Sequence, residues 1–240
     1  MIDTPQQLLF QKFDQTTIPM GQRWPIQDES WAVVLANGEQ PEHEIPMQLL
    51  QTAPFIVCCD GAILKCDWAD AAVGDGDSTP SWAREEYESI FHLESEQNDN
   101  DLTKATHFCI SKGFHRIVYL GATGMREDHT MANISLLMRY AKVFGVEAMM
   151  VTNYGWFNTV TPSVGIPQGD GQYVCQFQSF PSQQVSIFNF GCKQLRTEGL
   201  RYHGYPFEAL WQGTLNEATD DHFNIIADGD YLLYRTFCNK

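Results

Sequence analysis

Asp70-Ala71-Ala72-Val73-Gly74-Asp75-Gly76-Asp77-Ser78 joins an apolar segment to an acidic glycine turn, and the fold of the chain follows from that junction. The apolar residues before Gly74 predict a short buried strand that ends on the turn. Side chains at i and i+2 of an extended chain point the same way, so Asp75 and Asp77 are expected to face one ligand. Paired carboxylate oxygens suit a hard cation such as Mg²⁺. A solvated acidic turn is the alternative for so short a motif.

Apolar strands alternate with helical stretches on both sides of this turn, as far as about residue 152. Strands are expected at 31–36, 55–59, 70–73, 90–93, 116–120 and 146–151. Helices are expected at 43–52 and 81–89, in a segment after 101 that Gly113 ends, and from Asp128 to Gly145. In the last helix Met131, Ile134, Met138 and Ala141 fall on one face. Alternation of this kind predicts βαβ units in a parallel sheet.

The pattern changes beyond Asn153. Short strand-like runs follow one another between Gly, Pro and Asn turns, at 156–161, 172–180, 184–190, 194–202, 207–214, 222–227 and 230–237. Such spacing predicts a small β-sandwich or barrel. The expected fold class is therefore α/β plus β. A lead-in over 1–30 precedes a Rossmann-like parallel sheet with flanking helices over 31–153, and a small β-sandwich covers 154–240.

The composition excludes several classes of protein. The chain has 240 residues, is 43% hydrophobic and carries a net charge of −15, which disfavours binding to nucleic acid. No apolar run approaches the roughly 18 residues of a membrane span. The first thirty residues lack the basic and apolar regions of a secretion signal, so a cytoplasmic location is expected. Seven cysteines without a C-x-x-C pair fit reduced, buried thiols. The dispersed histidines make a zinc site unexpected.

Five aspartates fall at one predicted edge of the sheet. Asp60, Asp75 and Asp77 come just after strands, and Asp101 and Asp128 begin the helices that follow other strands. Ligands of open α/β sheets bind at the carboxyl ends of the strands, which is the edge that collects these residues. Asp101 and Asp128 could instead be first-turn helix acids with no chemical role.

Phosphate chemistry would account for so many charges at one edge. Helix N-termini there present free N–H groups that suit phosphates. The carboxylates would repel a polyphosphate unless Mg²⁺ intervenes or Lys104 and Arg126 neutralise the charge. Both basic residues could equally be ordinary surface charges. The combination suggests a Mg²⁺–nucleotide site.

Four ordered motifs resemble those of the thiamine pyrophosphokinase family. Residues 59–62, Cys-Asp-Gly-Ala, are similar to its D-G-[GA] turn, and residues 74–78 to its G-D-x-D-S motif. Residues 97–104, Gln-Asn-Asp-Asn-Asp-Leu-Thr-Lys, match Q-x-x-x-D-x-T-K. Residues 121–129 with Asn133 resemble G-x-x-G-x-R-x-D-H-x-x-x-N. The resemblance covers residues 31–152 most strongly, and residues 197–202 resemble a segment of the family's C-terminal β domain.

The resemblance implies transfer of a pyrophosphoryl group from ATP to the hydroxyl of thiamine, giving AMP and thiamine diphosphate. It implies a homodimer with active sites between subunits, an ATP- and Mg²⁺-binding domain over 31–153, and thiamine binding and dimerisation by the sandwich. Asp75, Asp77 and Asp101 would hold Mg²⁺, and Asp60 and Asp128 would complete the acidic cluster, one of them accepting the hydroxyl proton. Gln97, Lys104, Arg126 and Asn133 are implied on the ATP side.

Thiamine contacts are implied for Tyr202, Trp211 and Asn216, because a thiazolium cation favours an aromatic face. Each of the three could instead belong to the sandwich core. Leu215 stands where the family carries serine, and Gly76 stands where phenylalanine is common between the paired aspartates. Two alternatives stay open: another Mg²⁺-dependent nucleotide phosphotransferase or hydrolase with a different acceptor, and a non-catalytic nucleotide- or thiamine-binding module.

Overall fold

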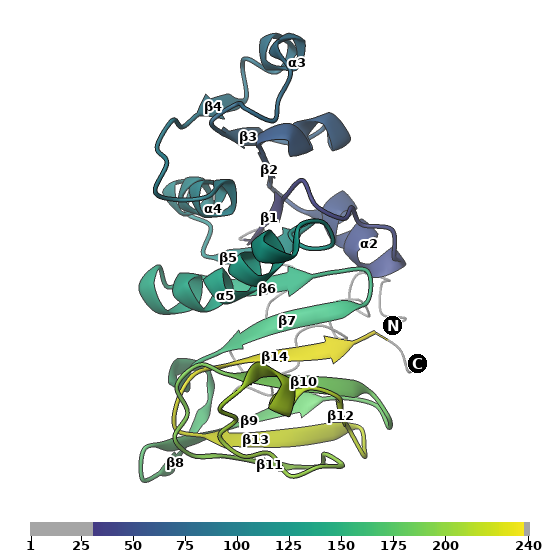
Figure 1. Cartoon of the computed structure of the whole chain (residues 1–240), viewed down its shortest axis with the longest axis vertical. Coiled ribbons are helices and arrows are strands. Elements are labelled where there is room, and N and C mark those ends of the chain that lie inside the picture. Colours follow the sequence, from purple (N-terminus) through teal and green to yellow (C-terminus); the bar gives the residue numbers. More distant parts are fainter. Residues whose placement is uncertain (1–30, 238–240) are drawn as a thin grey trace, which may run out of the picture. The chain divides into compact units, whose positions relative to one another are not determined.

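A computed structural model describes residues 31–237 of the chain, so the expected lead-in over 1–30 lies outside the described residues. The described chain forms two compact units that meet in sequence between Asn153 and Tyr154 (Figure 1).

The first unit is built on a parallel sheet with the strand order β6-β5-β1-β2-β3-β4. Its strands are β1 (Trp31–Leu35), β2 (Ile56–Cys59), β3 (Ala71–Gly74), β4 (Phe91–Leu93), β5 (Arg116–Leu120) and β6 (Glu147–Val151). Val33 of β1 pairs with Ile56 of β2 on one side and with Val118 of β5 on the other. All residues of β1, β2 and β3 are buried, which explains why these strands are continuous apolar runs rather than alternating ones.

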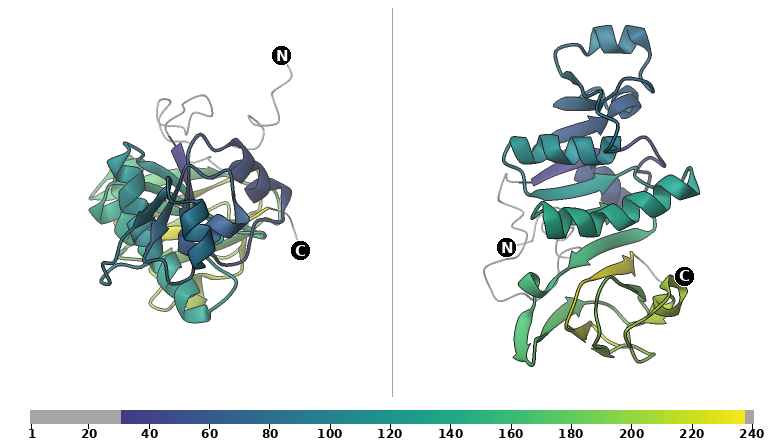
Figure 2. Two further views of the ribbon diagram at one scale, coloured as in Figure 1. Left: turned by 90° about the horizontal axis from the view of Figure 1, so that it is seen from above. Right: turned by 60° about the vertical axis from the view of Figure 1, so that its left-hand side comes forward.

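Helices cover the faces of this sheet. They are α2 (Glu44–Thr52), the 3₁₀ helix η1 (Asp60–Lys65), α3 (Ser81–Glu86), α4 (Asp101–Ser111) and α5 (Glu127–Val143). α4 packs on β1, β2 and β3, and α5 packs on β6. Figure 2 shows α4 and α5 side by side. Met138 of the expected apolar face of α5 is buried, but Met131 is 64% exposed, because the core side of α5 is carried by Leu137, Met138 and Tyr140.

The strand order reverses at β1, which lies between β5 and β2. Loops leaving the carboxyl ends of β1 and β5 therefore meet at the point where α/β sheets bind their ligands. Gly38 donates its N–H to the carbonyl of Gly121 at 2.7 Å. A Cβ on Gly38 would lie 2.4 Å from the carbonyl oxygens of Gly121 and Thr123, so only glycine allows the two loops to approach this closely.

The second unit is a β-sandwich of two antiparallel sheets, as the sequence predicts. One layer is the antiparallel group of strands β12-β10-β14-β7, and the other is the 4-stranded sheet β11-β13-β9-β8. The strands are β7 (Gly155–Val160), β8 (Ile166–Gly169), β9 (Gln172–Gln178), β10 (Gln184–Asn189), β11 (Leu195–Glu198), β12 (Asn216–Glu217), β13 (His222–Ala227) and β14 (Tyr231–Thr236). Val185, Ile187 and Leu233 of the first sheet share a core with Phe177 and Phe223 of the second.

Parts of the sandwich differ from the prediction. The expected strand at 207–214 is wrong. These residues hold the 3₁₀ helix η3 (Leu210–Gly213), because the side-chain oxygen Oε1 of Gln212 accepts the N–H groups of Glu208 and Ala209 and closes a turn. β8 and β12 were not predicted, since every residue of β8 is exposed and β12 has 2 residues. A second 3₁₀ turn, η2 (Pro162–Val164), joins β7 to β8. None of the helices described between residues 31 and 237 is long and apolar enough to span a membrane.

Candidate active site

Asp60 lies directly after β2 and opens η1. Its side chain is buried, with an exposed fraction of 2%, and its backbone has the left-handed value φ 39° that Asp and Asn tolerate best. The carboxylate accepts the N–H of Ser78 at 2.9 Å and the hydroxyl of Thr79. A Cβ on Gly74 would lie 2.6 Å from the Cβ of Asp60, so the glycine that ends β3 makes room for this carboxylate.

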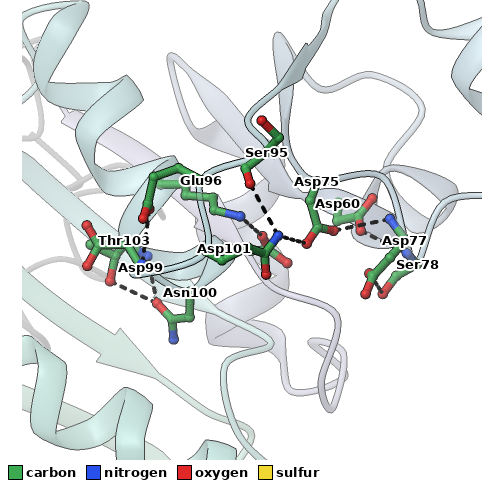
Figure 3. A network of polar contacts seen from close by, with 12 residues as sticks. Asp60, Asp75, Asp77, Ser78, Ser95, Glu96, Asp99, Asn100, Asp101 and Thr103 are labelled. Atoms are coloured by element: carbon green, nitrogen blue, oxygen red, sulfur yellow. Dashed lines mark hydrogen bonds and ion pairs between the residues drawn. The ribbon is translucent and has the colours of Figure 1, made fainter.

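Asp75 and Asp77 follow β3 and bring their carboxylates to the same place. One oxygen of each of Asp60, Asp75 and Asp77 lies within 4.8 Å of the others (Figure 3). Gln97 donates to Asp75 at 3.0 Å and the N–H of Asp77 donates to it at 3.2 Å. These donors, with Gln97 the larger influence, lower the pKa of Asp75, so its carboxylate is held in the charged form.

The chemistry of this acidic cluster, Asp60 with Asp75 and Asp77, suits a divalent cation. Within residues 31–237, no Lys or Arg nitrogen forms an ion pair with any of the three carboxylates. Carboxylates held close together without a counter-ion repel one another. A hard cation with oxygen ligands relieves that repulsion, and the donor set therefore fits Mg²⁺.

Asp101 and Lys104 lie beside the acidic cluster on the first turn of α4. Lys104 is buried, and its Nζ lies 3.4 Å from Asp101 Oδ1. Burial raises the pKa of Asp101, the cation of Lys104 opposes that shift, and the nearby carboxylates of Asp60 and Asp75 add to it. The family resemblance implies Asp101 as a metal ligand together with Asp75 and Asp77. Among the described residues, the carboxylates whose oxygens lie within 4.8 Å of one another are those of Asp60, Asp75 and Asp77.

Asp128 pairs with Arg126 and does not belong to the group formed by Asp60, Asp75 and Asp77. Its carboxylate accepts the Nε and terminal nitrogen of Arg126 at 3.2 and 2.7 Å, and both side chains are exposed. The guanidinium hydrogen bonds lower the pKa of Asp128. Asp128 therefore holds the side chain of Arg126 at the start of α5.

A cavity of about 310 Å³ opens at the carboxyl edge of the parallel sheet. Its walls are the ends of β1 and β2, the start of α4, the loop after β5 and the start of α5. Asp60, Asp101, Arg126 and Asn133 line it, whereas Asp75, Asp77, Gln97 and Lys104 lie outside the lining. The remaining lining residues are Ala36, Asn37, Gly38, Cys59, Gly61, Ser78, Asn100, Leu102, Gly121, Ala122, Thr123, Met125, His129 and Thr130.

Three residues that line the cavity were not predicted as site residues, although each lies just after a strand or just before a helix. Asn37 and Gly38 follow the carboxyl end of β1, the same position relative to a strand that drew notice to Asp60. Asn100 caps α4 by accepting the N–H of Thr103 at 3.0 Å, and it also lines the cavity. The signal for all three was their position after a strand or before a helix rather than a charge.

The residues for which the family resemblance implies thiamine contacts belong to the second unit. Asn216 is buried, and its amide oxygen accepts the N–H groups of Tyr202 and Glu217 at 3.0 and 2.9 Å. Its amide nitrogen donates to the carbonyl of Tyr202 at 2.8 Å, so Asn216 holds the Tyr202 segment in place. The side chains of Tyr202 and Trp211 are exposed, and Leu215 has a left-handed φ of 62° with an exposed side chain.

An open parallel α/β sheet with carboxylates at its carboxyl edge, followed by a β-sandwich, defines a catalytic domain of the nucleotide-binding type with an appended β domain. Comparison with protein families agrees with that division. The family described as "Thiamin pyrophosphokinase, catalytic domain" matches residues 46–149, and "Thiamin pyrophosphokinase, substrate-binding domain" matches residues 171–234. The two matches together cover more than half of the chain, and the chain belongs to the thiamin pyrophosphokinase family.

Individual relatives share a low sequence identity with this chain. Thiamin pyrophosphokinase 1 of Caenorhabditis elegans is 32% identical over 105 residues, a match that spans 38% of this chain and 43% of that protein. Thiamin pyrophosphokinase from Candida albicans has a similar structure, with a TM-score of 0.69, 17% identity, and coverage of 87% of this chain and 90% of that one. Thiamine pyrophosphokinase from Bacillus subtilis has a TM-score of 0.65 and 18% identity, and the match covers 86% of this chain and 98% of that one. At such identities the structures support the fold.

Proposed function

We propose that this chain is a thiamine pyrophosphokinase: it transfers the pyrophosphoryl group of ATP to the hydroxyl of thiamine, giving thiamine diphosphate and AMP. The observation that carries the proposal is the acidic cluster at the rim of the cavity, in the domain that matches the family's catalytic model. Phosphoryl-type transfer depends on positioning and on neutralisation of charge, and this edge of the sheet offers both.

The acidic cluster is the proposed metal site, with Mg²⁺ held by Asp60, Asp75 and Asp77 and with Asp101 next to them. When bound, the ion supplies charge neutralisation on the phosphate oxygens. Gln97 donates to Asp75 and keeps that carboxylate oriented. Asp60 is the buried member of the three, and it accepts hydrogen bonds from Ser78 and Thr79.

The proposed seat for the ATP phosphates lies between the starts of α4 and α5. The side chain of Arg126 makes no capping hydrogen bond at the start of α5, and Asp128 accepts the N–H of His129 at 2.9 Å, so the N–H groups of Glu127 and Asp128 are the ones proposed to meet an anion. Arg126 offers a planar guanidinium for bidentate contact. Lys104 adds a buried cation beside Asp101, and Asn133 positions the wall of the cavity by donating to the carbonyl of Ala122 at 2.8 Å.

Asp101 is the proposed acceptor for the proton of the thiamine hydroxyl. Its pKa is raised by burial, whereas the pKa values of Asp75 and Asp128 are lowered by hydrogen bonds. A carboxylate with a raised pKa is the better base of a set, because proton transfer to it is less uphill. Asp101 also lines the cavity, which puts it within reach of a bound substrate.

The acceptor site is proposed on the second unit. The exposed rings of Tyr202 and Trp211 can receive a thiazolium cation, and Asn216 holds Tyr202 by hydrogen bonds to its backbone N–H and carbonyl.

We further propose a homodimer with its active sites between subunits and a cytoplasmic location. Size-exclusion chromatography with light scattering tests the dimer.

The function is tested by incubating the purified chain with Mg²⁺, ATP and thiamine and separating the nucleotides and thiamine esters by chromatography. The proposal expects AMP and thiamine diphosphate in equal amounts, and no turnover in EDTA. Release of ADP, or nucleotide turnover that does not require thiamine, would contradict it and would point to a phosphotransferase or hydrolase with another acceptor.

A further inference from the structure

A chain of hydrogen bonds runs from the core of the first unit to the wall of the cavity. The hydroxyl of Tyr140, on α5, lies 2.8 Å from Thr103 Oγ1, on α4. Thr103 Oγ1 donates to Asn100 Oδ1 at 2.8 Å, and Asn100 Nδ2 donates to Asn133 Oδ1 at 3.1 Å. Asn133 Nδ2 then donates to the carbonyl of Ala122 at 2.8 Å. Figure 3 shows the bonds between Asn100 and Thr103 at the start of α4.

The neighbouring bonds indicate the direction of each hydrogen bond in this series. The N–H of Thr103 donates to Asn100 at 3.0 Å, so the Asn100 atom facing it is the oxygen. The single hydroxyl proton of Thr103 is donated to that same oxygen, so Tyr140 must be the donor to Thr103. The amide of Asn100 consequently faces Asn133 with its nitrogen. Asn133 accepts with its oxygen, and its nitrogen reaches a carbonyl that can only accept.

This series of hydrogen bonds joins α4 and α5 at two places. Asn133 and Tyr140 are seven residues apart, which places them two turns apart on one face of α5. Asn100 and Thr103 are the cap and first turn of α4, the turn that carries Asp101 and Lys104. Ala122 lies in the loop that supplies Thr123 and Arg126 to the cavity. The bonds therefore fix the first turn of α4 relative to that loop.

Tyr140 is suited to be a fixed anchor. It is fully buried, as is its neighbour Tyr119, and the two rings stack with centroids 5.5 Å apart. Burial raises the pKa of the Tyr140 hydroxyl, so the group keeps its proton and remains a donor. Tyr119 differs in one respect. Its hydroxyl contacts Thr106 Oγ1 at 3.0 Å, whose proton goes to the carbonyl of Leu102 within α4, so this pair of bonds does not reach the loop after β5.

We propose that Tyr140 is a positioning residue for the bound nucleotide: acting through Thr103, Asn100 and Asn133, its hydroxyl sets the distance between the α4 turn that carries Asp101 and Lys104 and the loop that carries Arg126. This inference rests on the proposed function only for the identity of the nucleotide, since the bonds belong to the cavity whatever the acceptor. Tyr140 does not touch the substrate.

The test compares Tyr140→Phe with Tyr119→Phe, two variants that each remove one hydroxyl from the same buried stack. Binding of Mg²⁺ with a non-hydrolysable ATP analogue is measured by calorimetry, alongside KM for ATP, KM for thiamine and the melting temperature. Tyr140→Phe is expected to weaken analogue binding and raise KM for ATP by about tenfold, the effect of losing one well-placed hydrogen bond. Its KM for thiamine should change less than twofold. Tyr119→Phe should lose similar thermal stability and bind the analogue like the natural chain.

Variants at Thr103 check the route through the chain. Thr103→Ser keeps the hydroxyl and should bind the analogue normally, whereas Thr103→Val should behave like Tyr140→Phe. The double variant should be no weaker than either single one, because both break the same chain. Equal loss of binding in Tyr140→Phe and Tyr119→Phe, or normal binding in Tyr140→Phe, would overturn the proposal.

The two proposals fail in different ways. If the natural chain binds the analogue but does not transfer to thiamine, the proposed function fails, and the order of the variants in binding still decides the role of Tyr140. If the natural chain binds no nucleotide, both proposals are wrong.

Discussion

Replacing Asp60 by asparagine should leave the stability of the metal-free protein unchanged or slightly higher, and should weaken its stabilisation by Mg²⁺. Asparagine tolerates the left-handed backbone at this position, so the substitution changes the charge and leaves the turn intact. The amide oxygen can still accept the N–H of Ser78, and the hydroxyl of Thr79 can rotate to accept from the new amide nitrogen. What is lost is the charge assistance of the two bonds, about 1–2 kcal/mol in total.

The removed charge offsets that loss. One oxygen of Asp60 lies within 4.8 Å of an oxygen of Asp75 and of Asp77, so two repulsive pairs disappear. Each pair costs about 1 kcal/mol at the dielectric constant of water and about 3.5 kcal/mol at an effective value of 20. Because Asp77 is exposed, the lower figure applies better, and two pairs give about 2 kcal/mol. In EDTA, Asp60→Asn should therefore melt at or slightly above the temperature of the natural chain.

Mg²⁺ should reverse that order. At a concentration ten times the dissociation constant, the natural chain gains about 1.4 kcal/mol, a rise in melting temperature of roughly 3–6 °C for a protein of this size. A tenfold weaker variant gains only about 0.4 kcal/mol at the same concentration, roughly 1 °C. Differential scanning fluorimetry across a Mg²⁺ titration, with and without EDTA, measures both arms.

Asp70→Asn is the matched control for this prediction. Asp70 also accepts a backbone N–H, that of Ile56 at 2.8 Å, but it lies at the amino end of β3. Its substitution should lower the melting temperature equally with and without Mg²⁺. A Mg²⁺ response of Asp60→Asn as large as that of the natural chain would remove Asp60 from the metal site and refute the reasoning.

Four other predictions test separate parts of the account. Asp75→Asn should abolish AMP formation while the circular dichroism spectrum stays unchanged; near-normal turnover would remove Asp75 from the site. Gly38→Ala should destabilise the chain by about 1–3 kcal/mol in urea titrations, because the new Cβ would lie 2.4 Å from two backbone carbonyl oxygens, whereas Gly113→Ala, with open space around it but φ 91°, should cost about 1 kcal/mol from backbone strain. Burial raises the pKa of Asp101 in the metal-free chain, so this residue should favour the folded state increasingly as pH falls through that raised pKa, because the folded chain binds the proton more tightly than the unfolded chain; in urea titrations with EDTA, Asp101→Asn should lose this gain in stability, and an unchanged pH dependence would contradict the prediction. Trp211→Ala should raise KM for thiamine about tenfold and leave KM for ATP unchanged in steady-state kinetics, and a change in KM for ATP alone would contradict its placement.

The sequence predicted the α/β unit well because its elements are marked by strong local signals. The apolar run Trp31–Leu35 and the helix that starts at Asp101 each combine hydrophobic pattern with a clear boundary. The exposed face of α5 could not be predicted in the same way. Met131 has the spacing of a core residue, yet the adjacent tertiary contacts bury Leu137 and Tyr140 instead.

The sandwich was predictable as a class but not strand by strand. Residues 207–214 alternate enough to suggest a strand, and the side chain of Gln212 turns them into a 3₁₀ helix through two bonds that no periodicity reveals. β12 forms from Asn216 and Glu217 only because β10 is there to pair with them. Non-local pairing of this kind leaves no local signal.

The candidate site was predictable as an edge of the sheet but not as a geometry. Asp60, Asp75 and Asp77 were placed together because all three follow strands, and the structure gathers their oxygens. Asp128 is not part of that group, and its carboxylate binds the guanidinium of Arg126, two residues earlier. The series of hydrogen bonds that starts at Tyr140 could not be predicted from the sequence, since buried hydroxyl groups have no sequence pattern of their own.

One labelling measurement tests the central claim most directly. The purified chain is mixed in excess with ATP that carries radioactive phosphorus in the β position, Mg²⁺ and thiamine, and the products of a single turnover are separated. The account predicts that all transferred label appears in thiamine diphosphate, with an equal amount of unlabelled AMP. Label recovered in ADP, or in pyrophosphate released to water, would contradict it.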